Sequence, residues 1–573
     1  MADLSETAAF PFVCEGGLVL NQSTFIMKPG QALELTNFEP DTEGGYRRIN
    51  GFKPYVNSIV PETAISTEPV LMSTIFNDYV IGARGTSIYR SASTTLRTKI
   101  ASDDTMSGSG SLLIKDSTSF SSSGTVVINS ENFTYTGKTA TTLTGVTRAR
   151  NSTTAAAHAV PDVVSETWTS IDSGRTSASK YNFEKFNFDG NDKIIVTDGT
   201  NDPTVFNTSL AATDVTESSV EGSKFVTAFK SHMFYAGKST TPQTLVFSQP
   251  FDEDAFSSGS GAGTIKVDDT IVGLKAFRGD LFIFCENRIF KLTGSTSSDF
   301  SITPVTRNIG CVNGDTIQEF AGDLIFLGPD GLRTVAGTAR IGDVELGTIS
   351  ANVQSIFDEN LVDAELFESI VIPDKTQYRI FFSKDGTGEN NTRGVICVMK
   401  GQNFEFSELR GIKPSSTDTF VEAGNVIVLH GGFDGYIHRQ EKGNDFNGTT
   451  VSGRYRSPDL TFGDPGIRKH MQRVVVNYKP ESAINADMFI RYDYEDKNSS
   501  RPAAYPLDSE DVVAIYGTST YGTPTYGGAS QPLLRQSVEG SGFAVALRVN
   551  DNATTAPYSL KGFQLEYQLG ARR

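Results

Sequence analysis

The stretch FRGDLFIFCENRIFKLTG, residues 277–294, has the pattern of a β-hairpin. Two apolar runs, 281–284 and 289–292, flank Glu286–Asn287, and Gly279–Asp280 precedes the first run. Short apolar runs bounded by turn residues predict two strands joined by a tight turn. An isolated hairpin is only marginally stable in water, so this hairpin needs neighbours that cover its faces.

The same plan recurs along most of the chain. FAGDLIFLGPDGLRTVAG, residues 320–337, repeats it with a Pro329–Asp330–Gly331 turn. Looser copies are found at residues 75–90, 188–206, 229–250, 374–401 and 423–440. From the second copy in the chain onward the starts lie roughly 40 to 50 residues apart, the interval of four-stranded propeller blades. Such copies bury one another's faces when they are arranged around an axis, so the sequence predicts a β-propeller of about six or seven blades.

Length and composition restrict the class of protein. The chain has 573 residues, 54 of them glycine, and long helical periodicity is nearly absent, which predicts an all-β protein of several domains. Its net charge of −17 is opposite to that of a protein that grips nucleic acid or an anionic membrane. DNA can still pass an acidic wall without tight binding. We also expect neither a standard export signal nor a membrane-spanning segment, because no long apolar stretch is present.

One interval between hairpins is too long for a blade and its loop. After the first hairpin ends near Arg90, an excess of roughly 60 to 70 residues precedes the second copy. Within residues 107–166, short alternating runs predict strands at 112–115, 125–129, 133–136 and 142–146. We therefore predict an inserted small β-barrel module at residues 96–169, in a propeller made of residues 61–95 and 170–444.

One helix is predicted, between Ser350 and Ser369. Ser350 is a candidate N-cap, and apolar residues recur at three- and four-residue spacing. They are Val353, Ile356, Phe357, Leu361, Ala364 and Phe367. Packing on the outside of the propeller is the simpler interpretation, and subunit contact is the alternative.

The hairpin repeat ends after about Asn444. Well-patterned runs at 474–478, 488–494, 543–549 and 562–567 predict a separate C-terminal β-sandwich, residues 445–573. Residues 1–60 consist of short extended pieces separated by glycine and proline. We predict an N-terminal extended segment that joins either this platform or the propeller.

No arrangement of residues typical of catalysis or of cofactor binding stands out. Cys285 and Cys397 lie in apolar strands, as small buried hydrophobic residues do. His430 and His438 could meet across one hairpin turn, and a structural role is the simpler interpretation. No two histidines have the spacing of a helical zinc site. We predict no catalytic residue, no cofactor and no metal.

Both ends of the chain carry motifs of a known family. The N-terminal region reads G-L-x-L-N at 17–21, K-P-G-x-A-x-x-L-x-N-F-E at 28–39 and G-G-Y-R-R-x-x-G-F at 44–52. The C-terminal region reads F-G-D-P-x-x-R-K at 462–469 and P-Y-S-L-x-G-F-x-L-E-Y-x-x-G-x-R-R at 557–573. Together they resemble the tail nozzle proteins, also called tail tubular or packaged-DNA stabilisation proteins, of short-tailed bacteriophages. Residues 143–159 are similar to a segment of small β-modules on phage virion proteins.

The resemblance implies a structural protein of the virion tail, assembled in the host cytoplasm, and not an enzyme. It implies a homo-hexameric ring that extends the portal-adaptor channel, retains the packaged DNA and conducts it during ejection. The implied partners are the tail adaptor protein, a tail fibre protein and double-stranded DNA that passes through the lumen without sequence-specific binding. Acidic residues along such a lumen would keep the DNA mobile.

Two groups of residues are candidates for subunit contact. Tyr516, Tyr521 and Tyr526 alternate with glycine, and they either present flat rings to a neighbouring subunit or pack on their own sandwich. Basic residues near the two ends are candidates to pair with acidic surfaces on a neighbour, although solvated surface charge is the alternative. They are Arg47, Arg48, Arg468, Lys469, Arg572 and Arg573.

The main alternative is a propeller-based tail protein that binds or hydrolyses host surface polysaccharide. Paired carboxylates perform glycoside hydrolysis, and propellers host this chemistry. Against this alternative, the chain has a single tryptophan, Trp168, and no S-x-D-x-G-x-x-W box. A cellular propeller adaptor is a third hypothesis, which leaves the motifs at the two ends without an explanation.

Overall fold

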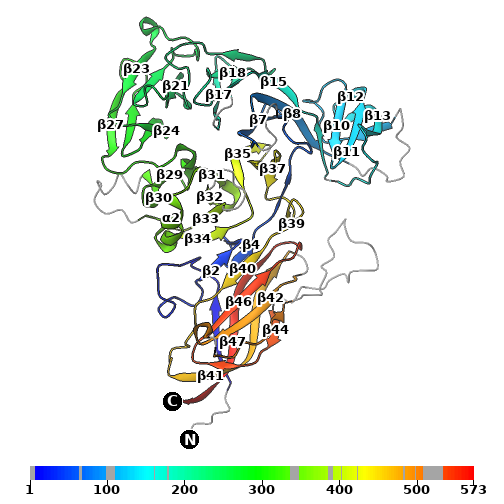
Figure 1. The fold of residues 1–573 in the computed structure, drawn as a ribbon, viewed down its shortest axis with the longest axis vertical. Coiled ribbons are helices and arrows are strands. Elements are labelled where there is room, and N and C mark those ends of the chain that lie inside the picture. The colour runs from blue at the N-terminus through cyan, green and yellow to red at the C-terminus, as the bar shows by residue number, and fades with distance from the viewer. Residues whose placement is uncertain are drawn as a thin grey trace.

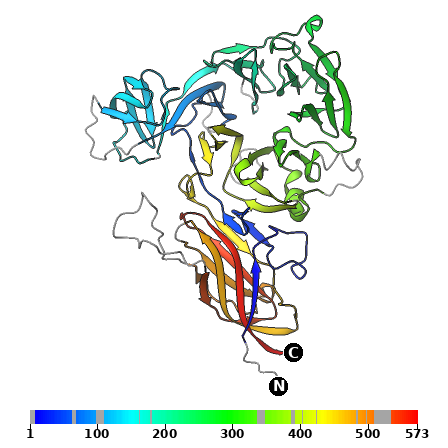
Figure 2. The same cartoon turned by 180° about the vertical axis from the view of Figure 1, so that it is seen from behind.

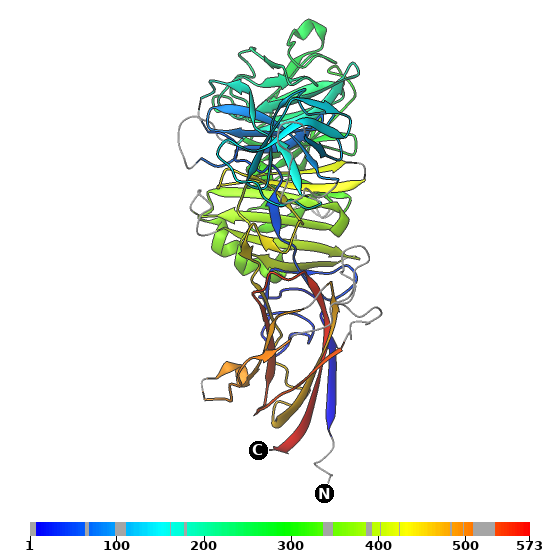
Figure 3. The same cartoon turned by 90° about the vertical axis from the view of Figure 1, so that its right-hand side faces the viewer.

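The computed structural model describes residues 7–62, 68–97, 110–160, 162–176, 180–335, 348–384, 392–401, 403–422, 424–481, 484–496, 498–507 and 533–572. A ring of β-sheets lies at one end of the molecule, a small barrel projects from its rim, and a sandwich with both termini extends from it (Figures 1 and 2). Figure 3 shows the ring and the sandwich following one another along the longest axis. The predicted fold class is confirmed: an all-β protein with a propeller, an inserted small barrel and a C-terminal sandwich.

The described part of the propeller contains seven β-units around the ring. Five form blade sheets that belong to the propeller alone. These are β16–β19 (Asn182–Phe188, Asn191–Thr197, Thr204–Phe206, Ala212–Asp214), β20–β23 (Phe225–Phe229, His232–Ala236, Thr244–Phe247, Gly263–Lys266), β24–β27 (Ile271–Phe277, Asp280–Cys285, Ile289–Thr293, Ser301–Thr306), β28–β30 (Gln318–Phe320, Asp323–Gly328, Gly331–Thr334) and β35–β37 with β5 (Pro414–Glu422, Asn425–Gly432, Ile437–Gln440, Phe52–Pro54), the last extended by β38 (Asp445–Phe446) and β39 (Thr449–Thr450).

The other two units are continuous with the sheets of adjoining domains. One contains β6 (Met72–Phe76), β7 (Tyr79–Arg84), β8 (Ser87–Thr95) and β15 (Thr169–Ser173), and β8 also pairs with the inserted module. The second contains β31 (Leu366–Ile372), β32 (Gln377–Ser383), β33 (Arg393–Lys400) and β34 (Asn403–Leu409), and β34 continues into the sandwich. The propeller is thus joined to each neighbouring domain by strand pairing.

The hairpin at 277–294 forms as predicted and shows why the repeat works. Its two apolar runs become β25 and β26, with Phe284 opposite Ile289. Phe284 packs against Phe326 of the next unit at 5.4 Å between ring centroids. Each pair of neighbouring units shares a hydrophobic cluster of this kind, including the pair that closes the ring, where Ile427 and Ile437 meet Ile75. Burial between units therefore supplies the stability that a single hairpin lacks.

The inserted module builds its own core between β8 and β15. Its strands are β9 (Gly110–Leu113), β10 (Gly124–Ile128), β11 (Glu131–Tyr135), β12 (Gly137–Thr139), β13 (Thr142–Arg150) and β14 (Val163–Glu166). Phe133, Leu143 and Val146 are fully buried in this core. The module is attached to the propeller by pairing of β14 with β8.

The sandwich combines the two ends of the chain in two sheets. One sheet contains β1 (Ala8–Val13), β3 (Phe38–Pro40), β4 (Tyr46–Arg48), β41 (Ile467–Pro480), β44 (Leu533–Ser537), β45 (Ser541–Gly542) and β47 (Tyr558–Arg572). The second contains β2 (Glu34–Thr36), β40 (Gly453–Arg456), β42 (Asp487–Tyr492), β43 (Tyr505–Pro506) and β46 (Val545–Asp551). The N-terminal segment thus joins both domains, because β1–β4 belong to the sandwich while β5 completes a propeller blade.

The helix prediction is wrong in its second half. A short 3-10 turn at Ala351–Val353 leads into α2 (Gln354–Leu361), and Phe367 lies in β31, where it pairs with Phe382. Ser350 does not cap the helix, because its hydroxyl accepts the backbone N–H of Leu332. Backbone pairing with β32 outweighs the local helical periodicity. None of the described helices is long and apolar enough to cross a membrane.

Candidate functional site: the junction of propeller and sandwich

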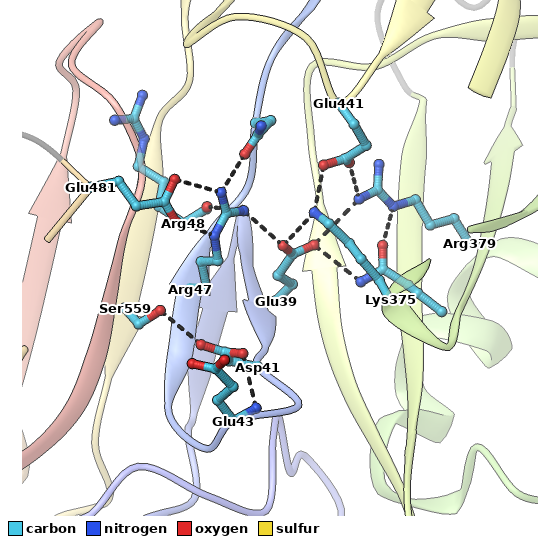
Figure 4. A network of polar contacts seen from close by, with 12 residues as sticks. Glu39, Asp41, Glu43, Arg47, Arg48, Lys375, Arg379, Glu441, Glu481 and Ser559 are labelled. Atoms are coloured by element: carbon cyan, nitrogen blue, oxygen red, sulfur yellow. Dashed lines mark hydrogen bonds and ion pairs between the residues drawn. The ribbon is translucent and has the colours of Figure 1, made fainter. Parts of the chain in front are cut away.

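Four segments that lie far apart in sequence converge where the propeller meets the sandwich (Figure 4). Glu39 and Arg47 come from β3 and β4 of the N-terminal segment. Arg379 comes from β32 of the propeller, and Glu441 directly follows β37. Glu481 directly follows β41 of the sandwich. The junction therefore links both domains through the N-terminal segment.

Glu39 is the centre of the junction, and its side chain is 3% exposed. Its Oε1 accepts hydrogen bonds from Arg47 Nη1 at 3.1 Å and from Lys375 Nζ at 2.6 Å. Its Oε2 accepts from Gln377 Nε2 at 3.1 Å and from Arg379 Nη2 at 3.3 Å. A buried carboxylate with this many donors is held in one position, and it fixes the segments that supply the donors.

Glu441 completes the propeller side of the network. Lys375 Nζ and Arg379 Nη2 each lie 2.5 Å from one of its carboxylate oxygens. Burial alone would raise the pKa of Glu441, but the two cations outweigh burial and lower the pKa to about 2. Arg379 itself is 1% exposed, so its charge depends on these carboxylates for compensation.

Arg47 and Arg48 fasten the network to the sandwich. Arg47 makes a two-point contact with Glu481, at 2.6 and 2.9 Å. Arg48 and Asp551 are fully buried and lie 3.3 Å apart, and Arg48 also donates to the carbonyls of Ala553 and Thr555. Arg47 and Arg48 thus make these hydrogen bonds within the chain, and their contact with a neighbouring subunit stays a prediction.

The remaining candidate contact residues lie at the far end of the sandwich. Ile467 pairs with Arg572 across β41 and β47, so the structure brings the two C-terminal motifs together. Arg468 donates to Ser541 and stacks over the ring of Phe543 at 4.8 Å. Lys469 is 1% exposed and donates to the carbonyls of Asp464 and Phe543, which removes it from the candidates for surface contact.

The other candidates keep their standing as predictions. Tyr516, Tyr521, Tyr526 and Arg573 lie outside the described residues. The Arg572 backbone ends β47. Of the basic candidates at the C-terminal end, Arg468 is therefore the one whose side chain is described and is not fully buried.

The histidine pair and the cysteines form part of the cores. His430 and His438 stack at 5.0 Å between ring centroids, and Asp434 lies 3.0 Å from His438 Nε2. Burial and the neighbouring His438 lower the pKa of His430 well below its usual value. All four cysteines are buried and free of disulfides. Within the described ranges, no three His, Cys, Asp or Glu side chains are grouped so that they could hold a metal ion.

The module motif at 143–159 also has a structural explanation. Arg148 Nη2 lies 2.7 Å from the fully buried carboxylate of Glu131, and His158 Nε2 lies 2.9 Å from it. The backbone amides of Ala149 and Ala156 donate to the same carboxylate. The motif therefore supplies the partners of one buried charge inside the module.

A second polar site lies at the propeller axis. A cavity of about 830 Å³ is lined by the first strands of six units, β16, β20, β24, β28, β31 and β35. Beside it, Glu368 is fully buried, forms an ion pair with Lys180 and accepts a hydrogen bond from Thr417 Oγ1 at 3.1 Å. Burial raises the pKa of Glu368 to about 8 and outweighs the attraction of the Lys180 ammonium.

The chain was compared with known families, curated proteins and solved structures. No family model and no curated protein matches it. The N-terminal domain of Nup159 is similar in structure at 10% identity, covering 45% of this chain and 88% of that one, with a TM-score of 0.28. An auxiliary nutrient binding protein from Bacteroides thetaiotaomicron VPI-5482 is similar at 9% identity, covering 71% and 97%, with a TM-score of 0.27. An exo-beta-1,3-galactanase from Phanerochaete chrysosporium is similar at 9% identity, covering 82% of this chain and 100% of that one, with a TM-score of 0.22.

Proposed function

We propose that this protein is a structural subunit of a phage tail nozzle ring, which extends the portal-adaptor channel, retains packaged DNA and conducts it during ejection. The observation that carries the proposal is the position of the motifs at the two chain ends. Phe38 on β3 pairs with Arg48 on β4, and Tyr46 on β4 pairs with Leu560 on β47. The motifs that resemble the nozzle family thus build one sheet, as parts of a shared functional domain would.

The junction suits a subunit that transmits force between its domains. A subunit around pressurised DNA must transmit force between domains without hinge motion. The Glu39–Arg379–Glu441 network is buried and crosses from the propeller to the sandwich, and β34 also pairs with β2 between these domains. Ion pairs with little exposure are held in one geometry more firmly than surface pairs, so the two domains move as one.

The net charge of −17 supports passage of DNA without capture. Carboxylates along a lumen repel phosphates and leave few cationic sites at which the duplex would stick. Replacing several lumen carboxylates with lysine is expected to slow genome release, and the slowing should weaken as salt is raised. Unchanged release would reject the repelling wall and leave the ring untouched.

Oligomeric state tests the proposal directly. We expect native mass measurement of the purified protein to give six copies, and negative-stain images to show a ring with a central hole. Arg468→Ala, at the described basic candidate for contact, should weaken the ring, whereas the matched control Arg288→Ala, on a propeller hairpin, should not. A protein that stays monomeric at high concentration and with the tail adaptor protein present contradicts the proposal.

A second function is favoured by one observation at the propeller axis. Burial raises the pKa of Glu368 to about 8 beside the axial cavity, and the general acid of a glycoside hydrolase is likewise a carboxyl group with a raised pKa. A propeller-based tail protein that hydrolyses surface polysaccharide is therefore the alternative. Incubation with host polysaccharide followed by measurement of chain length separates the two functions. Shortened chains that are absent with Glu368→Gln would favour the enzyme, and unchanged chains would favour the nozzle.

A further inference from the structure

A cleft of about 730 Å³ separates the inserted module from the propeller. Its propeller side is formed by the first and last units, with Tyr55, Ile75 and Ile427 among the lining residues. Its module side is formed by segments that carry Lys115, Asp116, Ser130 and Asp162 among others. The volume lies within the range of small-molecule sites, and such sites occur preferentially between domains.

Positive charge gathers on the propeller side of this cleft. Arg439 on β37 is directly opposite Lys53 on β5, so the two side chains leave the sheet on the same face. Lys53 is neutralised by Asp445, at 2.6 Å. Among the described residues, no carboxylate pairs with Arg439 or with the nearby Lys442. Burial and the charge of Arg439 lower the pKa of Lys442, so this pair is a site of uncompensated charge.

The rest of the lining suits hydroxyl groups rather than more negative charge. Thr95, Ser119, Ser130 and Asn447 line the cleft, and their side chains can donate and accept hydrogen bonds. Three aspartates, Asp78, Asp116 and Asp162, also line it. These carboxylates accept hydrogen bonds from hydroxyl groups and repel a ligand with the dense negative charge of a polyphosphate.

We propose that this cleft is a binding site for an acidic saccharide. In a sugar with one carboxylate and several hydroxyls per ring, a carboxylate would pair with Arg439 and Lys442. The hydroxyls would form hydrogen bonds with the hydroxyl, amide and aspartate side chains of the lining. The rings of Tyr55 and Tyr436, which also line the cleft, supply flat faces on which a sugar packs. A nucleic acid or polyphosphate is disfavoured, because it would bring dense charge against the three aspartates.

Calorimetry on the full-length protein tests the proposal with three probes: trigalacturonate, the neutral maltotriose and inorganic phosphate. We expect trigalacturonate to bind, with an affinity that falls as salt is raised, and maltotriose to bind at least about tenfold more weakly. Equal affinity for phosphate and trigalacturonate would show that the site binds anions in general, and it would overturn the saccharide assignment. Absence of trigalacturonate binding at millimolar concentration would also overturn it.

A matched pair of variants locates the binding. Arg439→Gln/Lys442→Gln is expected to weaken trigalacturonate binding by about tenfold or more. The control Lys28→Gln/Lys266→Gln removes the same charge from two exposed positions that do not line the cleft, and it should bind as the wild type does. Equal affinity of the cleft variant and the control would place the ligand elsewhere and reject the proposal.

The inference is independent of the nozzle function. The cleft residues belong to one chain, so ring assembly measured on Arg439→Gln/Lys442→Gln should equal that of the wild type. Loss of saccharide binding with an intact ring would separate the two results, and so would an intact site on a monomer.

Discussion

The propeller is attached to two other domains in contrasting ways. The sandwich meets it through a buried ion network, the pairing of β34 with β2, and an N-terminal segment that supplies strands to both domains. The module meets it through β14 on β8 and the hydrogen bonds of Asn57 with Ser165, Val127 and Val163, with an open cleft alongside. The first attachment resists movement, whereas the second leaves a surface on which a ligand can bind.

Buried charge has a different role at each of these two places. In the sandwich junction the charged side chains link different domains, so their loss should uncouple the domains. In the module Glu131, Arg148 and His158 all belong to the module itself, so their loss should unfold one domain and leave the attachment of the others unchanged. Four substitutions test this contrast.

Arg48→Ala is expected to have the largest effect. It leaves Asp551 buried with no cation, and it also removes the donors to Ala553 and Thr555. We expect a loss of about 4 kcal/mol in the free energy of unfolding of the sandwich. Hydrogen exchange of the β46 and β47 amides measures it. Exchange that stays at the wild-type rate would show that Arg48 is dispensable.

Glu131→Gln should follow, at about 3 kcal/mol, because the neutral amide leaves Arg148 buried without its carboxylate. Hydrogen exchange of the β11 and β13 amides along a denaturant series reports the module, while hydrogen exchange of β25 reports the propeller. We expect the first signal to shift to lower denaturant concentration and the second to stay. A parallel shift of both would mean that module and propeller unfold together.

Glu131 also predicts how the module responds to acid. Burial opposes its charge, but hydrogen bonds from Arg148, His158 and two backbone amides outweigh burial and lower its pKa to about 2 from the usual 4.5. A carboxylate with a lowered pKa contributes its full stability above pH 4.5 and loses it as the pH falls toward 2. Wild-type module stability should therefore fall over this interval, and Glu131→Gln should flatten that part of the profile.

Glu39→Gln should cost about 2 kcal/mol, less than Arg48→Ala, because Glu441 still compensates Arg379 and Lys375. The Glu39→Gln variant should also differ in the number of unfolding transitions. In calorimetry, its propeller and sandwich should unfold in two transitions rather than one. The charge-keeping Glu39→Asp provides the control, with partial recovery expected. A single transition in Glu39→Gln would show that β34–β2 pairing alone couples the domains.

Arg288→Gln should have the smallest effect. Arg288 forms an ion pair with Asp268 on a propeller hairpin, and the two side chains are 40% and 63% exposed. Water screens such a pair, so we expect a change within about 0.5 kcal/mol in chemical denaturation. A loss comparable to that of Glu39→Gln would erase the distinction between buried junction charges and surface charges.

Local patterns in the sequence predicted most of the propeller. The runs at 281–284 and 289–292 became strands because the preferences of short apolar runs and of turn residues act over a few positions. The helical periodicity of residues 350–369 failed beyond Leu361, because Phe367 is paired with Phe382 on a neighbouring strand. That partner comes from tertiary structure, and nothing near Phe367 in the sequence indicates it.

The junction was missed for the same reason. Arg47 and Arg48 stood out as basic residues, but their partners Glu481 and Asp551 lie more than 400 residues away along the chain. Glu39, Arg379 and Glu441 carry no local motif. A scan for hydrophilic residues that recur in strand interiors would have drawn attention to Arg379 in QYRIFFS, where a charge interrupts an apolar run.

By itself, the sequence determined the repeat, the inserted module, the all-β composition and the acidic charge, because strand and turn preferences and net charge depend on residues close together or on simple sums. Tertiary structure alone decided that β5 completes the last propeller unit, that both chain ends share one sandwich, and which charges are buried together. These depend on contacts between distant residues, whose free energy is gained only when the ring has closed and water has left the junction.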